Sequence, residues 1–166
     1  HELVRHRAGF AFSQRSQRYV DESGSKFVIP PALQDNSDSF DDANAILTGA
    51  LEKASESYNE LVDALGKALP RENFESSTDH RKAIRQAARS VLPNATETKI
   101  FVTANVRAWR HFLEMRSTSF ADTEIRNLAI TVLEILQKEA PLLFGDFTFD
   151  TMSDGTRIAS PKYSKV

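Results

Sequence analysis

Residues 105–136 read NVRAWRHFLEMRSTSFADTEIRNLAITVLEIL and carry the clearest helical periodicity in the chain. Asn105 can cap a helix over residues 106–116, because its side-chain oxygen can accept from the unpaired backbone N–H groups of the first turn. A single stripe of apolar side chains predicts a second helix, which Pro141 ends. That stripe consists of Ile125, Leu128, Ala129, Val132, Leu133 and Leu136. Two consecutive helices therefore form the centre of the predicted fold.

Further helices are predicted on the amino-terminal side of this pair. Apolar residues recur at helical spacing over residues 41–69, where Pro70 ends the pattern, and again over residues 79–92. Ser119 and Asp122 have the spacing of a capping box, with Ser119 as the cap of the helix that carries the Ile125–Leu136 stripe.

The remaining segments are predicted to be short strands, loops or helix ends. They are a helical end at residues 2–6, extended chain to residue 29, a polar loop at 35–42, a buried strand at 99–103, a strand at 143–149, and a loosely held polar tail after Thr151. The predicted fold class is α+β, a helix-dominated domain with a small sheet. We expect one catalytic-type domain over residues 1–166, incomplete at its amino terminus because the first residue is His1 and not methionine.

The composition limits the classes of function. Hydrophobic residues make up 40% of the chain, which allows a real core and argues against global disorder. The sequence has no cysteine, which excludes disulfides and a cysteine nucleophile in this chain and agrees with a cytoplasmic location. A net charge of −2 argues against general binding of nucleic acid, and no apolar run is long enough to span a membrane. The four histidines lack the spacing of metal ligands, so no metal site is expected.

Arginines are unusually dense near the amino terminus. Arg5, Arg7, Arg15 and Arg18 alternate with serine, glutamine and histidine, which makes a donor-rich segment suited to phosphate or to the polar edge of a base. The alternative is a solvated, positively charged pair of strands. Composition alone leaves both interpretations open.

Arg116 is placed unusually within its predicted helix. At 3.6 residues per turn it continues a face formed by Trp109, Phe112 and Leu113. Because a buried guanidinium without a partner costs several kcal/mol, Arg116 should meet a carboxylate, carbonyl groups or an anionic ligand. The alternative is that it extends to solvent or pairs with a nearby acid such as Glu124. Arg107 and His111 lie on the opposite face.

Three blocks of this sequence resemble the flavin-dependent thymidylate synthases. Arg5-His6-Arg7 followed by SQRSQRY at residues 13–19 is similar to the RHR…S signature of that family. RSVLPNATET at residues 89–98 resembles its second block, and NVRAWRHFLEMR at 105–116 with ADTEIR at 121–126 resembles its third. The resemblance covers nearly the whole chain, in order, and implies a thymidylate synthase-complementing-protein-like fold with its amino-terminal part missing.

The resemblance implies an enzyme that converts dUMP to dTMP. Methylenetetrahydrofolate would donate the carbon, and FAD reduced by NADPH would carry the hydride. Members of the family are cytoplasmic homotetramers whose active sites are shared between subunits, so dUMP and further copies of the chain are the expected partners. Because this chain has no cysteine, the thiolate mechanism of the other class of thymidylate synthase is excluded here.

The resemblance also assigns residues to roles. The cofactor-binding residues implied are Arg5, His6, Arg7, Gln14, Asn105, Arg107 and His111. The substrate-binding residues implied are Glu2, Arg5, Gln14, Ser16, Gln17, Arg18, Arg89 and Arg116. Arg116 is further expected to be catalytic, by stabilising the ionised pyrimidine.

The chain departs from the family signature at one point, and two other hypotheses remain. One extra residue lies between Arg7 and Ser16, within AGFAF at residues 8–12, and an insertion in extended chain can flip or bulge the residues after it. This motivates the alternative of a degenerate homologue that binds FAD or nucleotide without turnover. A module binding RNA or single strands through residues 5–19 is disfavoured by net acidity and the lack of an aromatic platform.

Overall fold

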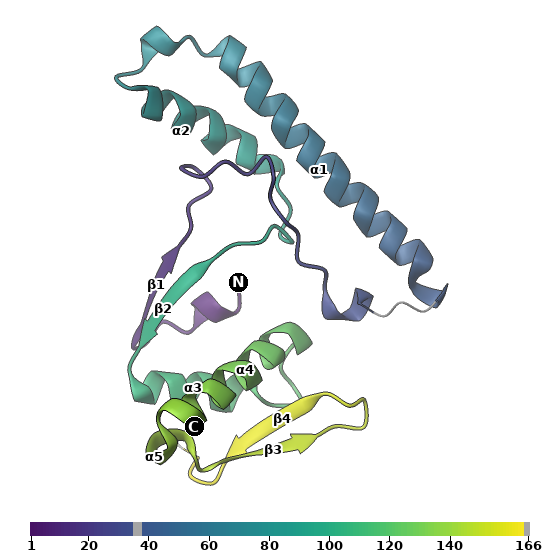
Figure 1. Cartoon of the computed structure of the whole chain (residues 1–166), viewed down its shortest axis with the longest axis vertical. Coiled ribbons are helices and arrows are strands. Elements are labelled where there is room, and N and C mark those ends of the chain that lie inside the picture. The colour runs from purple at the N-terminus through teal and green to yellow at the C-terminus, as the bar shows by residue number, and fades with distance from the viewer. Residues whose placement is uncertain (35–37, 165–166) are drawn as a thin grey trace. The chain divides into compact units, whose positions relative to one another are not determined.

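The computed structural model describes residues 1–34 and 38–164 of the chain (Figure 1). It is an α+β fold dominated by helices, with two small two-stranded sheets among the described residues, β1–β2 and β3–β4. The chain divides into two compact units, one formed by His1–Ser13 and Phe101–Val166 and the other by Gln14–Ile100. No helix in the described part of the chain is long and apolar enough to cross a membrane.

The first unit contains most of the carboxy-terminal half of the chain. Its elements are the 3₁₀ helix η1 (Leu3–Arg5), β1 (Phe10–Gln14), β2 (Ile100–Ala104), α3 (Val106–Arg116), α4 (Thr123–Glu139), α5 (Pro141–Phe144), β3 (Phe147–Thr151) and β4 (Arg157–Pro161). Its core lies between α3, α4 and the β3–β4 hairpin, where Phe112, Leu133 and Phe144 are almost completely buried. Each such side chain contributes roughly 1.5–3 kcal/mol when buried, so this core supports the unit.

The caps of α3 and α4 explain where the two central helices begin. Asn105 Oδ1 accepts from the backbone N–H of Ala108 at 2.9 Å, which confirms the predicted cap of α3. The predicted capping box at Ser119 is wrong, because Asp122 is itself the cap of α4 and accepts from the N–H of Glu124 at 3.0 Å. Ser119 thus lies in the loop between the helices.

The end of the chain differs from its prediction. Residues 143–149 are not one strand, since Pro141 starts the short helix α5 and β3 begins only at Phe147. Gly145 allows this close turn, because a Cβ there would lie 2.5 Å from the carbonyl oxygen of Pro141. The predicted loose tail is also wrong, because β4 pairs antiparallel with β3 and buries Ala159.

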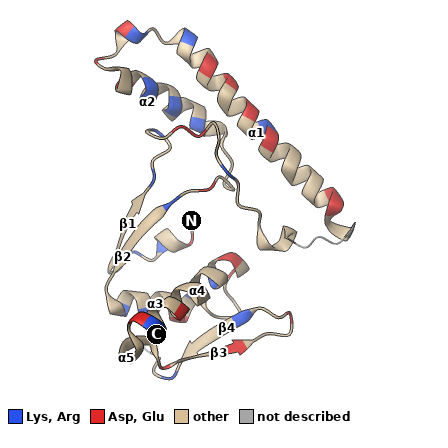
Figure 2. Cartoon of the chain, in the orientation of Figure 1, with Lys and Arg blue, Asp and Glu red and all other residues tan. Residues whose placement is uncertain are grey.

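The second unit is built on a helical hairpin, α1 (Asp41–Ala68) and α2 (Ser77–Ala88). Leu51, Tyr58 and Ile84 are buried, while acidic residues dominate the outer face of α1 and basic residues line α2 (Figure 2). Ser76 caps α2 by accepting from the N–H of Asp79 at 3.1 Å. Compared with the helix predicted over 79–92, α2 begins two residues earlier, at Ser77, and ends at Ala88. The chain then continues as the 3₁₀ helix η5 (Arg89–Val91).

The smaller elements of this unit are the 3₁₀ helices η2 (Pro31–Leu33), η3 (Asp38–Phe40) and η4 (Arg71–Asn73). Of the polar loop predicted at 35–42, residues 35–37 lie outside the described residues, and the remainder is helical. The strand predicted at 99–103 is present as β2 at Ile100–Ala104, but it is not buried. Its side chains alternate between exposed and half-buried, and Phe101 is 75% exposed.

Candidate functional site

Arg116, the last residue of α3, forms the centre of a polar cluster in the first unit. Its Nη1 donates to Glu2 Oε2 at 2.7 Å, and its Nε donates to His6 Nε2 at 2.9 Å. The side chain is 25% exposed and continues a face on which Phe112 and Leu113 are fully buried, as the spacing predicts. The acid that pairs with it is Glu2, 114 positions away, and not the neighbouring Glu124.

His6 is held in one protonation state by its surroundings. Because the Nε–H of Arg116 donates to His6 Nε2, that ring nitrogen must carry a lone pair, and the ring proton belongs on Nδ1. Burial lowers the pKa of His6 below its usual value, the charges of Arg116 and His111 lower it further, and Glu2 acts in the opposite direction. The imidazole is therefore neutral near pH 7.

The rings around His6 restrict its orientation. The Phe112 ring packs edge-on at 5.1 Å between centroids, and the His111 ring lies 6.0 Å away. His111 is exposed, yet it approaches His6, so the two histidines implied by the resemblance to bind FAD lie side by side.

An open pocket of about 620 Å³ lies in the first unit next to this cluster. It is lined by His1, Glu2, Arg5, Arg116, Phe120, Ala121 and Asp122. The 3₁₀ helix η1 sets Glu2 and Arg5 one turn apart, with the Arg5 N–H donating to the Glu2 carbonyl at 3.1 Å. Two guanidinium groups and the exposed ring of Phe120 make the pocket suited to a ligand that is both anionic and planar.

The segment that carries the extra residue begins with a turn at Ala8 and Gly9, before β1. Gly9 has φ of 77°, and a Cβ there would lie 2.7 Å from Asn105 Nδ2. The Gly9 carbonyl accepts from the Asn105 N–H at 3.3 Å. Glycine is therefore required for this turn to rest against the start of α3.

The other candidates of the first unit are placed around this turn. Arg7 is exposed just before it, and Arg107 is exposed in the first turn of α3. Asn105 uses Oδ1 as the helix cap, so its Nδ2 is the part of the side chain that can serve a ligand. The structure thus gathers Glu2, Arg5, His6, His111 and Arg116 around one pocket and its adjoining cluster.

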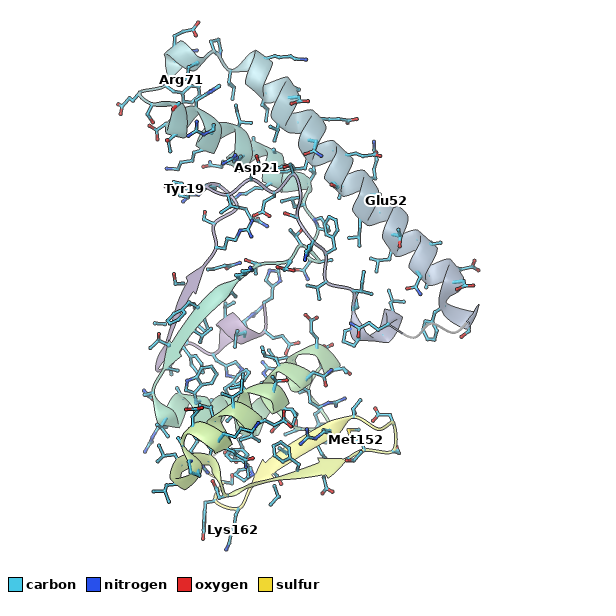
Figure 3. All side chains as sticks on the ribbon, in the orientation of Figure 1. Tyr19, Asp21, Glu52, Arg71, Met152 and Lys162 are labelled. Atoms are coloured by element: carbon cyan, nitrogen blue, oxygen red, sulfur yellow. The ribbon has the colours of Figure 1, made fainter. Side chains whose placement is uncertain are left out.

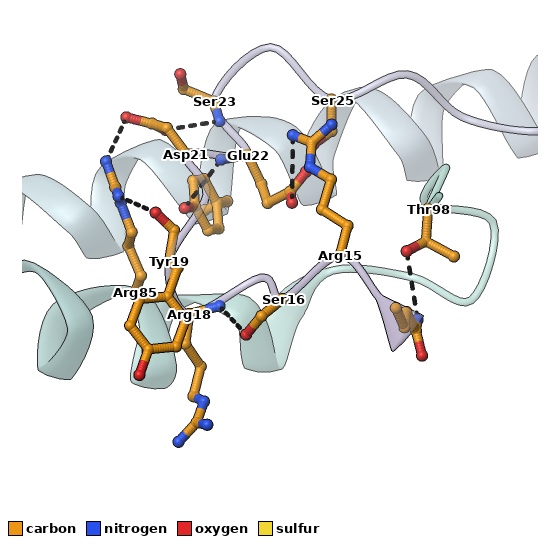
Figure 4. Close-up of polar contacts among 12 residues, drawn as sticks. Arg15, Ser16, Arg18, Tyr19, Asp21, Glu22, Ser23, Ser25, Arg85 and Thr98 are labelled. Atoms are coloured by element: carbon orange, nitrogen blue, oxygen red, sulfur yellow. Dashed lines mark hydrogen bonds and ion pairs between the residues drawn. The ribbon is translucent and has the colours of Figure 1, made fainter. Parts of the chain in front are cut away.

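The remaining candidates belong to the second unit, which begins at Gln14, the last residue of β1; Ser16 and Arg18 are labelled in Figure 4. Gln14 Nε2 donates to Thr98 Oγ1 at 3.3 Å, and Ser16 Oγ accepts from the Arg18 N–H at 3.4 Å. The Arg18 guanidinium lies 5.8 Å from the centre of the Tyr19 ring. Gln17 is half-buried and Arg89 is exposed at the start of η5.

A buried carboxylate anchors this loop. Glu22 is 4% exposed, accepts from Ser25 Oγ, and lies 3.6 Å from Arg15 Nη2 (Figure 4). Its backbone N–H donates to the hydroxyl of Tyr58 at 3.3 Å, and burial raises the pKa of that hydroxyl. These contacts fix the far end of the segment that contains Ser16, Gln17 and Arg18.

Arg85 of α2 adds a second anchor to the same loop. It donates to the Tyr19 carbonyl at 2.9 Å and to Asp21 Oδ2 at 3.0 Å. The pKa of Asp21 is lowered by the hydrogen bond from the Ser23 N–H and also by Arg85, against an opposing effect of burial. Arg85 thus holds the loop to α2.

Sequence reasoning missed several of these residues. Phe120, Ala121 and Asp122 form a pocket wall to which the sequence assigned no role, although Ala121 and Asp122 lie in a stretch that resembles a family block, and Glu22 lies in a polar run without periodicity. Buried Arg126 had a detectable signal, since it lies four and seven positions before the buried Ile130 and Leu133 on one face of α4. In the described part of the chain, no group of three or more histidine, aspartate or glutamate residues could hold a metal ion.

Comparisons with known proteins agree on one family. The family model described as thymidylate synthase complementing protein matches residues 1–142. Flavin-dependent thymidylate synthases of Mycobacterium tuberculosis and Mycobacterium bovis are 48% identical over 160 residues, which is 96% of this chain and 61% of the relative. That of Mycolicibacterium gilvum is 47% identical over 167 residues, covering 100% of this chain and 64% of the relative. The chain therefore spans less than two thirds of the length of these relatives.

Proposed function

Because this chain belongs to the thymidylate synthase complementing protein family, we propose that it acts in the reductive methylation of dUMP to dTMP. In this proposal methylenetetrahydrofolate donates the carbon and FAD, reduced by NADPH, carries the hydride. The observation that carries the proposal is the placement of Arg116 on the pocket, held by Glu2 and His6.

The chemistry of the reaction explains why a guanidinium is needed there. Methyl transfer to C5 of uracil requires electron density in the pyrimidine ring, and this chain has no thiol to add at C6. A fixed cation beside N3 and its neighbouring carbonyl favours the ionised, enolate-like ring. Arg116 uses two of its five N–H donors on Glu2 and His6, which leaves donors for the substrate.

Glu2 and His6 prepare Arg116 for this role. The carboxylate of Glu2 fixes the guanidinium plane, and the lone pair of neutral His6 fixes its Nε. Both act before substrate arrives, so little reorganisation is needed when charge develops on the ring. Protonation of His6 would remove the acceptor and place a second cation beside Arg116.

Two features of the pocket support the proposal that it takes part in binding a flavin nucleotide. Arg5 can meet phosphate, and the exposed Phe120 offers an apolar face to a planar ring. His6, Arg7, Gln14, Asn105, Arg107 and His111 are the further residues proposed to hold FAD. When bound, FAD supplies the hydride, which no side chain can deliver.

The residues proposed to hold dUMP fall in both units. Glu2, Arg5 and Arg116 belong to the first unit, whereas the second contributes Gln14, Ser16, Gln17, Arg18 and Arg89. Hydroxyl, amide and guanidinium donors are the groups that recognise phosphate and the polar edge of uracil. We further propose one catalytic domain, a homotetramer with shared active sites, and a cytoplasmic location, as the family resemblance implies.

The test is to incubate the chain, and in parallel the full-length protein, with dUMP, methylenetetrahydrofolate, FAD and NADPH and to measure dTMP. Formation of dTMP above a control without protein, lost in Arg116→Ala and retained in Arg81→Ala, is the expected result. Arg81 is a suitable control because it is exposed on α2 and hydrogen-bonds only to Thr78 among the described residues.

The second candidate is a homologue that binds FAD or nucleotide without turnover, and the extra residue within residues 8–12 is the observation that favours it. The visible absorption of the purified protein separates the two. Bound flavin without dTMP supports the binding protein, and ready turnover excludes it. Absence of flavin binding, of dUMP binding and of dTMP formation would contradict both candidates.

A further inference from the structure

The loop at residues 117–122 begins directly after Arg116 and connects α3 to α4. Phe120, Ala121 and Asp122 of this loop line the pocket, so its position sets one wall of the candidate site. The Phe120 ring is 98% exposed and makes no contribution to the core. The loop must therefore be held by groups other than the side chain at its tip.

One anchor lies at the start of the loop, on β4. Ser117 is fully buried, and its carbonyl accepts from the Ala159 N–H at 2.9 Å. The Ser117 hydroxyl lies 2.9 Å from the Ala159 carbonyl as well. This pairing joins the first loop residue to the middle of the β3–β4 hairpin.

The second anchor is the guanidinium of Arg126 on α4, which is 4% exposed. Its Nη1 donates to the Ser119 carbonyl at 3.3 Å, and its Nη2 donates to Thr156 Oγ1 at 3.1 Å. The Thr156 hydroxyl in turn donates to Asp154 Oδ1 at 2.6 Å, within the turn that joins β3 to β4. Figure 3 labels Met152 in this turn. A single chain of hydrogen bonds thus runs from the pocket loop through Arg126 to the hairpin.

In the part of the chain that the structure describes, the buried charge of Arg126 has no direct ion pair, although, after the hydrogen bonds from Thr156, it acts through space to lower the pKa of the Asp154 carboxyl. Within the described residues, no carboxylate lies within ion-pair distance of Arg126, and its buried Nε has no hydrogen-bond partner. A buried cation in that state is costly, and an apolar side chain of similar volume is often neutral or stabilising in its place. What Arg126 provides, and an apolar side chain would not, is the hydrogen bond that holds the Ser119 carbonyl.

The hairpin lies beyond the span that the family model matches. That match ends at residue 142, whereas both anchors end on residues 154–159. We propose that the β3–β4 hairpin positions the pocket wall at residues 117–122, and that Arg126 and Ser117 are the positioning residues that connect them. The identity of the ligand that contacts this wall, dUMP or FAD, rests on the proposed function.

Hydrogen exchange tests this positioning without requiring activity. The Ala121 N–H donates to the Thr118 carbonyl at 3.2 Å inside the loop, so its protection reports whether the loop is ordered. In Thr156→Val and Arg126→Met we expect exchange over residues 118–122 to accelerate about three- to tenfold, the factor that one lost hydrogen bond carries. Arg126→Lys should recover only part of the protection, because an ammonium cannot span both acceptors as a fork does.

Two controls make the result decisive. Thr148→Val changes an exposed threonine in the same hairpin and should leave exchange in the loop unchanged. The melting temperature of Arg126→Met should stay near that of the unaltered chain, because the loss is local. Unchanged exchange in the loop of Thr156→Val and Arg126→Met would overturn the proposal, as would equal acceleration throughout α4.

Ligand affinity then links this wall to the proposed function. The dissociation constants of dUMP and of FAD, measured by titration calorimetry, should rise about three- to tenfold in Thr156→Val and not in Thr148→Val. Accelerated exchange with no ligand binding even in the unaltered chain would contradict the proposed function and leave the hairpin's role supported. Accelerated exchange with unchanged affinity would show that the wall is ordered by the hairpin but does not contact these ligands, which overturns the functional half of the inference.

Discussion

The candidate residues of the first unit and those of the second unit are held in different ways. In the first unit the candidate residues Glu2 and His6 each contact the candidate Arg116 directly. In the second unit the candidates at residues 14–18 depend on anchors that carry no assigned role, chiefly Glu22 and Arg85. Substitution of a candidate should therefore change the chemistry in the first unit, whereas substitution of an anchor should change affinity in the second.

The largest expected effect is that of Arg116→Ala on turnover. Removing one preorganised donor from a developing negative charge typically costs a factor of about 100–1000 in kcat. Arg116→Lys should recover only part of the rate, because an ammonium cannot serve Glu2, His6 and substrate from one planar group. Steady-state dTMP formation measures the rate, and flavin absorbance checks that the variant still binds cofactor. Loss of less than tenfold in Arg116→Ala would remove Arg116 from the catalytic role.

Glu22→Ala should act on the second unit alone. It removes a buried carboxylate from Ser25 and Arg15, at a cost of about 1–3 kcal/mol, a range kept low because Arg15 is partly exposed. We expect weaker dUMP binding with FAD binding retained, both measured by titration calorimetry. The dUMP affinity of Glu22→Gln, which keeps an acceptor for the Ser25 hydroxyl, should lie between that of the unaltered chain and that of Glu22→Ala. Equal loss of both ligands would contradict the difference between the two units.

Gly9→Ala tests the turn that precedes β1. The positive φ and the close approach to Asn105 should make this substitution destabilising by about 1–2 kcal/mol. Gly66→Ala is the matched control, because Gly66 lies inside α1 with open space around it. This substitution should raise the free energy of unfolding by up to about 1 kcal/mol. Chemical denaturation measures both, and a neutral Gly9→Ala would show that the turn adapts.

The smallest expected effect is the pH dependence that His6 contributes. Because the pKa of His6 is lowered in the folded chain, the unfolded chain binds a proton at this residue more readily than the folded chain does. Protonation of His6 therefore destabilises the folded chain. The contribution of neutral His6 is complete above about pH 6.5, its unfolded pKa, and is lost as pH falls from there toward the lowered value. The melting temperature should decline over that range, whereas turnover should decline at its lower end, where folded His6 takes up the proton and loses its contact with Arg116. His6→Gln should flatten that part of both profiles, and an unchanged profile would exclude His6 as the source.

Much of the fold could be predicted because its signals are local. The Asn105 cap and the apolar stripe of α4 identify two helices from neighbouring residues alone. The errors fall where one local signal competes with another. Pro141 started a helical turn inside an apolar run that has the composition of a strand, and the polar residues after Thr151 concealed β4, whose pairing with β3 is not local.

The candidate site was predictable in part, for a related reason. The position of Arg116 on an apolar face follows from helical periodicity, and it led correctly to the need for a partner. The identity of that partner did not follow, because Glu2 lies 114 residues away and the nearer Glu124 was equally acceptable on charge. The wall at residues 120–122 was missed because a loop side chain has no periodicity from which its direction can be read.

The sequence by itself determined where helices start and stop, which faces are apolar, and which residues resemble the family blocks, since each depends on neighbours along the chain. Only the tertiary structure decided that Glu2 and His6 meet Arg116, and that buried Arg126 reaches Ser119 on one side and Thr156 on the other. The physical reason is that hydrogen bonds and ion pairs form between any groups that the folded chain brings within about 3 Å, and that proximity is a property of packing rather than of spacing in the sequence.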